Sequence, residues 1–348
     1  MASHYHIVSL EKCTGNPTEL TVWATAKQLK AINPNLKVMF YWDTDQGALP
    51  CYIANTEYMK HPEWWLRNDA GVLVNSSLNT PIMDYTVAAA RDWWVSIPLN
   101  GTGSPMSPWI DGVLADSTGG VCPGPGINAK RCAALEAGKS AMVRQLQGLF
   151  NATNGGSVLG NGITMYTDHH GMHTTNDSNG IMAEHFAAFE DMKPDGTLNV
   201  TRVAKFLELV SRAAQEGKIV VIATWVGNYV GVMKWFNNTQ PTTNDGWRAA
   251  MLAKHTFALA GYLTVAEPNV WMQYEGWYQM SAGAVPCPEA PETCMAPSEA
   301  DWYPDLFKPL GAPLGVAVRA GNVFTRSFQH AKSVLNLDTP DASSVTFF

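Results

Sequence analysis

The most regular part of the sequence is an amphipathic helix followed directly by an apolar strand. Residues 199–216 repeat apolar side chains along one face of a helix, and Gly217 ends that helix. Residues 218–225 then form an unbroken apolar run with Ile-Val-Val-Ile in its middle. Such a run is typical of a parallel strand that is buried on both faces, and parallel sheets are covered by helices. This stretch therefore predicts an α/β architecture.

The same alternation recurs along most of the chain. We predict eight strands, at residues 6–11, 37–42, 81–85, 111–116, 162–167, 181–184, 218–225 and 262–267. Helices are expected at 18–31, 87–97, 133–150, 199–216 and 249–260, and residues 55–67 are expected to form a helix or a pair of turns. Eight strands separated mostly by helices predict a (β/α)8 TIM barrel over residues 1–310.

The C-terminal part of the sequence has a different character. Residues 268–310 are rich in Pro, Trp and Tyr without periodicity, which favours an ordered loop region within the barrel domain. Residues 316–318, 322–328 and 333–336 alternate like β-strands. We therefore predict a small terminal β-hairpin, over residues 311–348, that packs on the barrel.

Charge and hydropathy exclude two classes of partner. The chain has 348 residues and a formal net charge of -7, and it contains no basic run, so we do not expect nucleic acid to bind. No apolar stretch approaches the length of a membrane span, so no membrane association is expected. The sequence does not indicate an oligomeric state.

Cysteines and glycosylation sequons indicate an oxidising compartment. The six cysteines form no C-x-x-C pair, and their spacing favours the disulfides Cys13–Cys51, Cys122–Cys132 and Cys287–Cys294, which are one of 15 possible connectivities. Sequons occur at Asn75, Asn100, Asn151, Asn176, Asn199 and Asn237. We expect a secreted or lumenal glycoprotein. No signal peptide precedes the first strand, which suggests a mature chain whose secretion signal was replaced by a start codon.

Acidic and aromatic residues lie at or just past the carboxyl ends of the predicted strands, where side chains of a TIM barrel face the active site. These residues are Glu11, Asp43, Asp84, Asp116, Asp168 with His169 and His170, Glu184, Trp225 and Glu267. Paired carboxylates cleave glycosidic bonds, and aromatic faces bind sugar rings. An Asp after a strand also commonly caps a turn or a helix, so several of these acids are expected to be structural.

We predict that Asp116 and Glu184 are the catalytic pair, with Asp168 as the substitute for either. Ser117 and Thr118 provide hydroxyls beside Asp116 that stabilise its ionised form, whereas the apolar residues before Glu184 favour a protonated carboxyl. The predicted substrate-binding residues are Tyr41, Trp42, Asp43, Asp84, His169, His170, Trp225 and Glu267. No cofactor and no metal are predicted for this carbohydrate-cleaving site.

Several segments carry a family resemblance. Residues 33–42, 61–66, 84–85, 91–94 and 111–116 look like the corresponding parts of poorly characterised TIM-barrel glycoside hydrolases, and residues 313–315, 324–328 and 334–336 are similar to their terminal β-structure. The resemblance covers most of the chain. It implies a barrel fold and an acid where Asp116 stands. The His-rich residues 168–173 do not match the pattern.

Two alternative functions remain open. A metal-dependent hydrolase could bind zinc through Asp168, His169, His170 and His173, and His4 and His6 are similar to the paired histidines of metallohydrolase barrels. However, His4 and His6 lie at the start of their strand, on the wrong rim, and the adjacent His169 and His170 do not readily both face one ion. A non-catalytic carbohydrate-binding barrel is the third class, because binding and cleavage use the same residue types.

Overall fold

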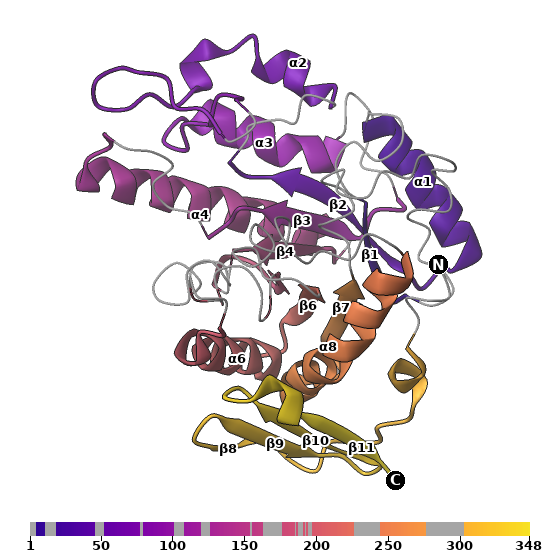
Figure 1. The fold of residues 1–348 in the computed structure, drawn as a ribbon. Helices are drawn as coiled ribbons and strands as arrows, with labels where there is room; N and C mark the ends of the chain where they lie inside the picture. Colours follow the sequence, from indigo (N-terminus) through magenta and orange to yellow (C-terminus); the bar gives the residue numbers. More distant parts are fainter. Residues whose placement is uncertain are drawn as a thin grey trace. The chain divides into compact units, whose positions relative to one another are not determined.

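The structure is a computed structural model, and it divides the chain into two compact units, Met1–Met182 and Ala183–Phe348. It describes residues 5–10, 19–45, 52–76, 79–100, 108–119, 126–153, 155–162, 176–184, 186, 191, 193, 197–225, 244–275 and 303–348. Figure 1 shows the described elements.

The first unit is built on parallel strands that pair in chain order. These strands are β1 (Ile7–Leu10), β2 (Lys37–Asp43), β3 (Gly112–Asp116), β4 (Ser157–Asn161) and β5 (Gly180–Ala183). Every residue of β4 and all but the first of β2 are buried, as expected for a parallel sheet with both faces covered. The register places Asp43 directly opposite Asp116, where β2 and β3 end.

Helices connect and cover these strands. They are α1 (Glu19–Ile32), α2 (Ala54–Tyr58), the short 3-10 helix η1 (Pro62–Trp64), α3 (Ala88–Asn100) and α4 (Ala129–Thr153). Two buried indoles join α3 to β2, because Trp42 Nε1 donates to Trp94 O at 3.1 Å and Trp94 Nε1 donates to Asp43 O at 2.9 Å. The end of β2 is thus fixed by the neighbouring helix.

The second unit contains a parallel pair, β6 (Ile219–Trp225) and β7 (Val270–Glu275), with helices α6 (Val200–Gln215) and α8 (Asn244–Val265). An antiparallel sheet follows, with β8 (Val318–Ala320), β9 (Val323–Ser327), β10 (Ala331–Asn336) and β11 (Ser344–Phe347). The short 3-10 helices η4 (Pro304–Phe307) and η5 (Pro340–Ala342) lie near it in sequence.

The terminal sheet packs against α8. Leu259, Leu263 and Ala266 form a buried cluster with Phe328 and Ala331, and Figure 1 shows the sheet alongside the helix. The predicted terminal β-structure is therefore present, as a four-stranded sheet rather than a hairpin. The predicted domain boundary at residue 310 stays a prediction.

The α/β prediction is confirmed, whereas a complete barrel is not. The described residues contain seven parallel strands in chain order. The predicted strand 81–85 is wrong, because Pro81 and Met83 form only isolated antiparallel bridges, to Asn75 and Trp65. The strand predicted at 162–167 instead ends at Asn161, and residues 163–167 lie outside the described part.

The predicted strand 262–267 is also wrong, because α8 continues to Val265. Its apolar run is ambiguous between helix and strand, and the deciding contact is non-local: Leu259 and Leu263 face the terminal sheet at helical spacing. Pro268 follows the end of α8, and the next strand, β7, begins at Val270.

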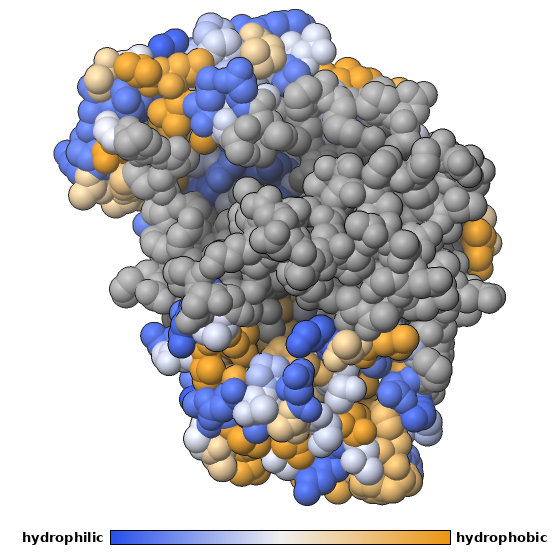
Figure 2. Space-filling view, in the orientation of Figure 1, coloured by the Kyte–Doolittle hydropathy of each residue, from blue (hydrophilic) through white to orange (hydrophobic). Residues whose placement is uncertain are grey.

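The described surface of each unit mixes hydrophilic and hydrophobic residues on the face that Figure 2 shows. None of the helices in the described residues is long and apolar enough to cross a membrane.

Candidate active site at the end of β3

Asp116 is the last residue of β3, and three donors contact its half-buried carboxylate. The Tyr41 hydroxyl donates to Oδ2, and the Ser117 backbone N–H and the Asn161 side-chain amide each donate to Oδ1 at 2.8 Å. Tyr41 belongs to β2 and Asn161 ends β4, so both neighbouring strands contribute. Donors aimed at a carboxylate stabilise its negative charge, which suits a nucleophile or a general base.

Backbone hydrogen bonds hold Asp116 between its neighbours. Thr44 donates to the Asp116 carbonyl through its backbone N–H at 3.0 Å and its hydroxyl at 2.7 Å. Thr118 makes the same two bonds, both at 2.7 Å, to the carbonyl of Asn161. Pairing thus continues beyond the ends of β2, β3 and β4, and this fixes the backbone that carries the carboxylate.

Two glycines allow the loops after β3 and β4 to touch. A Cβ on Gly119 would lie 2.3 Å from the carbonyl oxygen of Gly162, and one on Gly162 would lie 2.1 Å from the nitrogen of Gly119. These atoms belong to the backbone and cannot rotate away. A side chain at either position would therefore separate the two loops beside Asp116.

A second group of polar side chains meets at the end of β2 and on the loop that follows it. The buried Asp43 accepts from the Asp45 N–H at 2.8 Å, and Asp45 accepts from the Tyr85 hydroxyl at 2.7 Å and from Lys139 Nζ at 2.6 Å. Burial raises the pKa of Tyr85 well above its usual value, and the Asp45 carboxylate raises it further. Tyr85 therefore remains a hydrogen-bond donor at any ordinary pH.

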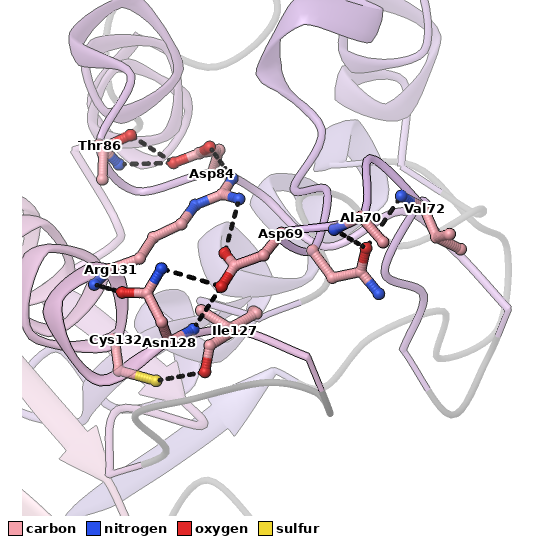
Figure 3. Close-up of polar contacts among 10 residues, drawn as sticks. Asp69, Ala70, Val72, Asp84, Thr86, Ile127, Asn128, Arg131 and Cys132 are labelled. Carbon is pink, nitrogen blue, oxygen red and sulfur yellow. Dashed lines mark hydrogen bonds and ion pairs between the residues drawn. The ribbon is translucent and has the colours of Figure 1, made fainter.

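The Asp84 carboxylate bonds to Thr86 and Arg131, as Figure 3 shows. Its Oδ1 accepts from the Thr86 N–H at 3.0 Å and from the Thr86 hydroxyl at 2.6 Å, which is the local turn geometry that Asp favours. Its Oδ2 pairs with Arg131 at 3.2 Å, and Arg131 also reaches Asp69 at 3.6 Å. The predicted role of Asp84 in substrate binding has no support from this geometry.

Two other predicted substrate-binding residues are also engaged elsewhere. Trp42 is only 1% exposed and stacks on Tyr52 at 5.6 Å between ring centroids, so it belongs to the core. Glu267 follows α8 and precedes β7, so it does not end a strand as predicted, and its Oε1 pairs with buried Arg326 at 2.6 Å. The basis for predicting Glu267 at the rim is therefore removed.

Of the remaining predicted site residues, only some lie in the part of the chain that the structure describes. Glu184 follows β5, is half buried and belongs to the second unit, whereas Asp116 belongs to the first. Trp225 ends β6. Glu11, Asp168, His169, His170 and His173 lie outside the described residues. The catalytic pair therefore stays a prediction. No group of three or more metal-binding side chains occurs in the part of the chain that is described.

Of the six cysteines, only Cys132 lies in the described residues, and it is not a free thiol. Its sulfur lies 3.8 Å from the Ile127 carbonyl oxygen (Figure 3). Cys13, Cys51, Cys122, Cys287 and Cys294 lie outside the described residues, so the three disulfide pairings stay predictions.

Sequence reasoning missed three residues of the Asp116 surroundings: Asn161, Asp45 and Lys139. Asn161 was hidden because the strand that it ends was predicted to begin one residue later. Lys139 lies in the middle of a helix, where a lysine usually faces solvent. Only the tertiary structure shows that it is buried.

Residues 30–332 match the model of a family described as hypothetical glycosyl hydrolase family 15. The chain belongs to this family. Membership confirms the prediction of a glycosidase-like protein, and it covers most of both units. No curated protein matches the sequence.

Among solved structures, the chain is similar to α-L-fucosidase isoenzyme 2 from Paenibacillus thiaminolyticus, with 12% identity and a TM-score of 0.42 over 72% of this chain and 36% of that one. It is also similar to a GH36 α-galactosidase from Geobacillus stearothermophilus, with 13% identity and a TM-score of 0.41 over 89% and 37%. A cyclic α-maltosyl-(1→6)-maltose hydrolase from Arthrobacter globiformis shows 11% identity and a TM-score of 0.45 over 90% and 70%. The chain thus spans little more than a third of the first two proteins, and these similarities do not bear on its substrate.

Proposed function

We propose that the protein is a glycoside hydrolase that cleaves a poly- or oligosaccharide with two carboxyl groups, one of which is Asp116. The observation that carries this proposal is the set of three donors on the Asp116 carboxylate at the end of a buried parallel strand. Family membership supports the reaction class.

In the proposed reaction Asp116 acts in its ionised form. It either attacks the anomeric carbon or removes a proton from the attacking water, while a protonated carboxyl gives its proton to the leaving oxygen as the glycosidic bond breaks. We propose Glu184 for the acid, with Asp168 as the substitute. Tyr41, Ser117 and Asn161 keep the Asp116 oxygens in place, so that the carboxylate needs little rearrangement during the reaction.

Asp111 provides a matched control, because it flanks the other end of the same strand. Its carboxylate accepts from the Val38 N–H at 2.7 Å and pairs with Lys30 at 2.7 Å. It is thus a hydrogen-bonded aspartate of similar surroundings, but it lies at the amino end of β3, away from the site. A change there tests the cost of altering such a carboxylate without touching the proposed chemistry.

The test is a reducing-sugar assay of the purified protein on a panel of polysaccharides and aryl glycosides, followed by Asp116→Asn and Asp111→Asn on any substrate that is cleaved. We expect Asp116→Asn to lose a factor of about 10³ or more in turnover, since a general acid or base alone contributes about 10² to 10⁴. Asp111→Asn should keep its turnover. Cleavage by Asp116→Asn at more than a tenth of the wild-type rate would contradict the proposal.

We also propose that the protein is secreted or lumenal. Asn75, Asn151 and Asn176, three of the sequon asparagines, are exposed in the structure and therefore accessible to glycosylation. Enzymatic deglycosylation of the protein from a eukaryotic secretory host should lower its mass, and an unchanged mass would count against this proposal.

A further inference from the structure

Lys139 is a buried cation that joins the loops after β2 and β3. It lies in α4, and its side chain is 5% exposed. The ammonium donates to Asp45 Oδ1 at 2.6 Å and to the Ser117 carbonyl at 2.7 Å. Asp45 lies two residues beyond β2, and Ser117 follows Asp116 at the end of β3.

The sequence places Lys139 there through its neighbour Gly138. A Cβ on Gly138 would lie 2.1 Å from the Tyr85 carbonyl oxygen, so only glycine lets α4 approach this backbone so closely. Arg91 donates to the same carbonyl at 2.6 Å and holds it in place. The Nζ atom of Lys139, which contacts both loops, lies 5.0 Å from the centroid of the Tyr85 ring.

Ser117 is the residue through which Lys139 can influence Asp116. Its φ is 59°, in the left-handed region that non-glycine residues seldom adopt. The N–H of Ser117 donates to Asp116 Oδ1, and its carbonyl accepts from Lys139. Because one residue's dihedral angles set the directions of both groups, a contact that fixes the carbonyl also aims the N–H.

We propose that Lys139 is a positioning residue for the proposed reaction: by holding Ser117 in its left-handed conformation, it aims the Ser117 N–H at the Asp116 carboxylate. This inference rests on the proposed function of Asp116. Lys139 acts through Ser117, and its ammonium is occupied by Asp45 and the Ser117 carbonyl.

The same strand carries an ion pair that lacks this connection. Lys30 pairs with Asp111 at 2.7 Å beside the amino end of β3, and its side chain is 16% exposed. Lys30→Met therefore removes a lysine–aspartate pair next to β3 without touching Ser117. Lys30→Met is the matched control for Lys139→Met. Each substitution keeps the length and apolar stem of the side chain and removes its charge.

A second variant separates positioning from charge burial. Lys139→Met leaves Asp45 without its cation, and this alone can weaken the fold. In Lys139→Met/Asp45→Asn both charges of this ion pair are removed, and an asparagine at position 45 still accepts from the Tyr85 hydroxyl. The double variant should regain stability without regaining the Ser117 geometry.

Two readouts test the proposal, one of which does not need activity. We expect the Ser117 amide to exchange its hydrogen about tenfold faster or more in both Lys139 variants, relative to the amides of β3, and to be unchanged in Lys30→Met. We expect kcat to fall about 10- to 100-fold with KM nearly unchanged, because a misdirected carboxylate affects the transition state more than binding.

Protection of Ser117 and kcat both unchanged in the double variant would overturn the inference. Loss of the fold in both Lys139 variants would also overturn it, because Lys139 would then be required for folding in general. Retained activity in Asp116→Asn would instead refute the proposed function and leave the exchange result to decide whether Lys139 orders Ser117.

Discussion

We expect the substitution of glycine by alanine to have opposite effects on stability at two positions of α4. Gly138 is buried against Tyr85, whereas Gly148 is exposed, and a Cβ there would meet no atom within 4 Å beyond its chain neighbours and its own helix backbone. Alanine in a helix interior is more favourable than glycine by about 0.8–1 kcal/mol. Gly148→Ala should therefore raise the free energy of unfolding by about that amount.

Gly138→Ala meets a larger opposing cost. The added methyl would lie 2.1 Å from the carbonyl oxygen and 2.7 Å from the carbonyl carbon of Tyr85. Both atoms belong to the backbone, so α4 or the backbone at Tyr85 must move. Overpacking costs about 1–3 kcal/mol, and a backbone clash of this size belongs near the upper limit. After the helix propensity is subtracted, we expect a net loss of about 2 kcal/mol, so the two variants should differ by about 3 kcal/mol.

Equilibrium urea unfolding, followed by both tryptophan fluorescence and circular dichroism, measures these differences and shows whether the units unfold together. If Gly138→Ala is as stable as Gly148→Ala, the close approach of α4 to Tyr85 is wrong, and the placement of Lys139 that depends on it is wrong as well.

Two further predictions concern pH and the terminal sheet. Hydrogen bonds to the Glu63 and Glu57 carboxylates raise the pKa of His61, so these bonds stabilise the fold below the ordinary histidine pKa of about 6.5, and this stabilisation is lost as pH rises through the folded pKa. NMR titration should give a His61 pKa above about 6.5, and Glu63→Gln should lower that pKa. A wild-type pKa at or below about 6.5 would contradict this prediction. Glu267→Gln should cost about 1–3 kcal/mol of stability, because it removes a charged partner from buried Arg326, yet leave kcat unchanged; a loss of kcat with normal stability would instead support Glu267 as a substrate-binding residue.

Local patterns were sufficient for β3, which carries Asp116, and for α6 with the strand β6 that follows it. The apolar run that ends at Asp116 and the periodic helix before β6 are both signals within one segment, and both elements form as predicted. The end of α8 was mispredicted because Leu263 and its neighbours suit either a helix or a strand, and contact with Phe328 of the distant terminal sheet favours the helix.

The surroundings of Asp116 depend on contacts between distant residues, and no local pattern predicts them. Tyr41 and Asn161 are separated from Asp116 by 75 and 45 positions, and they meet it only because three strands pair in one register. The spacing of acids likewise could not distinguish Asp116 from Asp84. Both follow an apolar segment, but only the fold shows that Asp84 is occupied by Thr86 and Arg131.

The most direct test of the central claim compares binding with cleavage in Asp116→Asn. On the substrate that the wild-type protein cleaves, we predict that the variant binds with a Kd within about threefold of the wild-type KM while turnover falls by about 10³ or more, because the change removes a reacting charge and leaves the shape of the site. A variant that binds and still cleaves at more than a tenth of the wild-type rate would show that Asp116 is not the catalytic carboxylate.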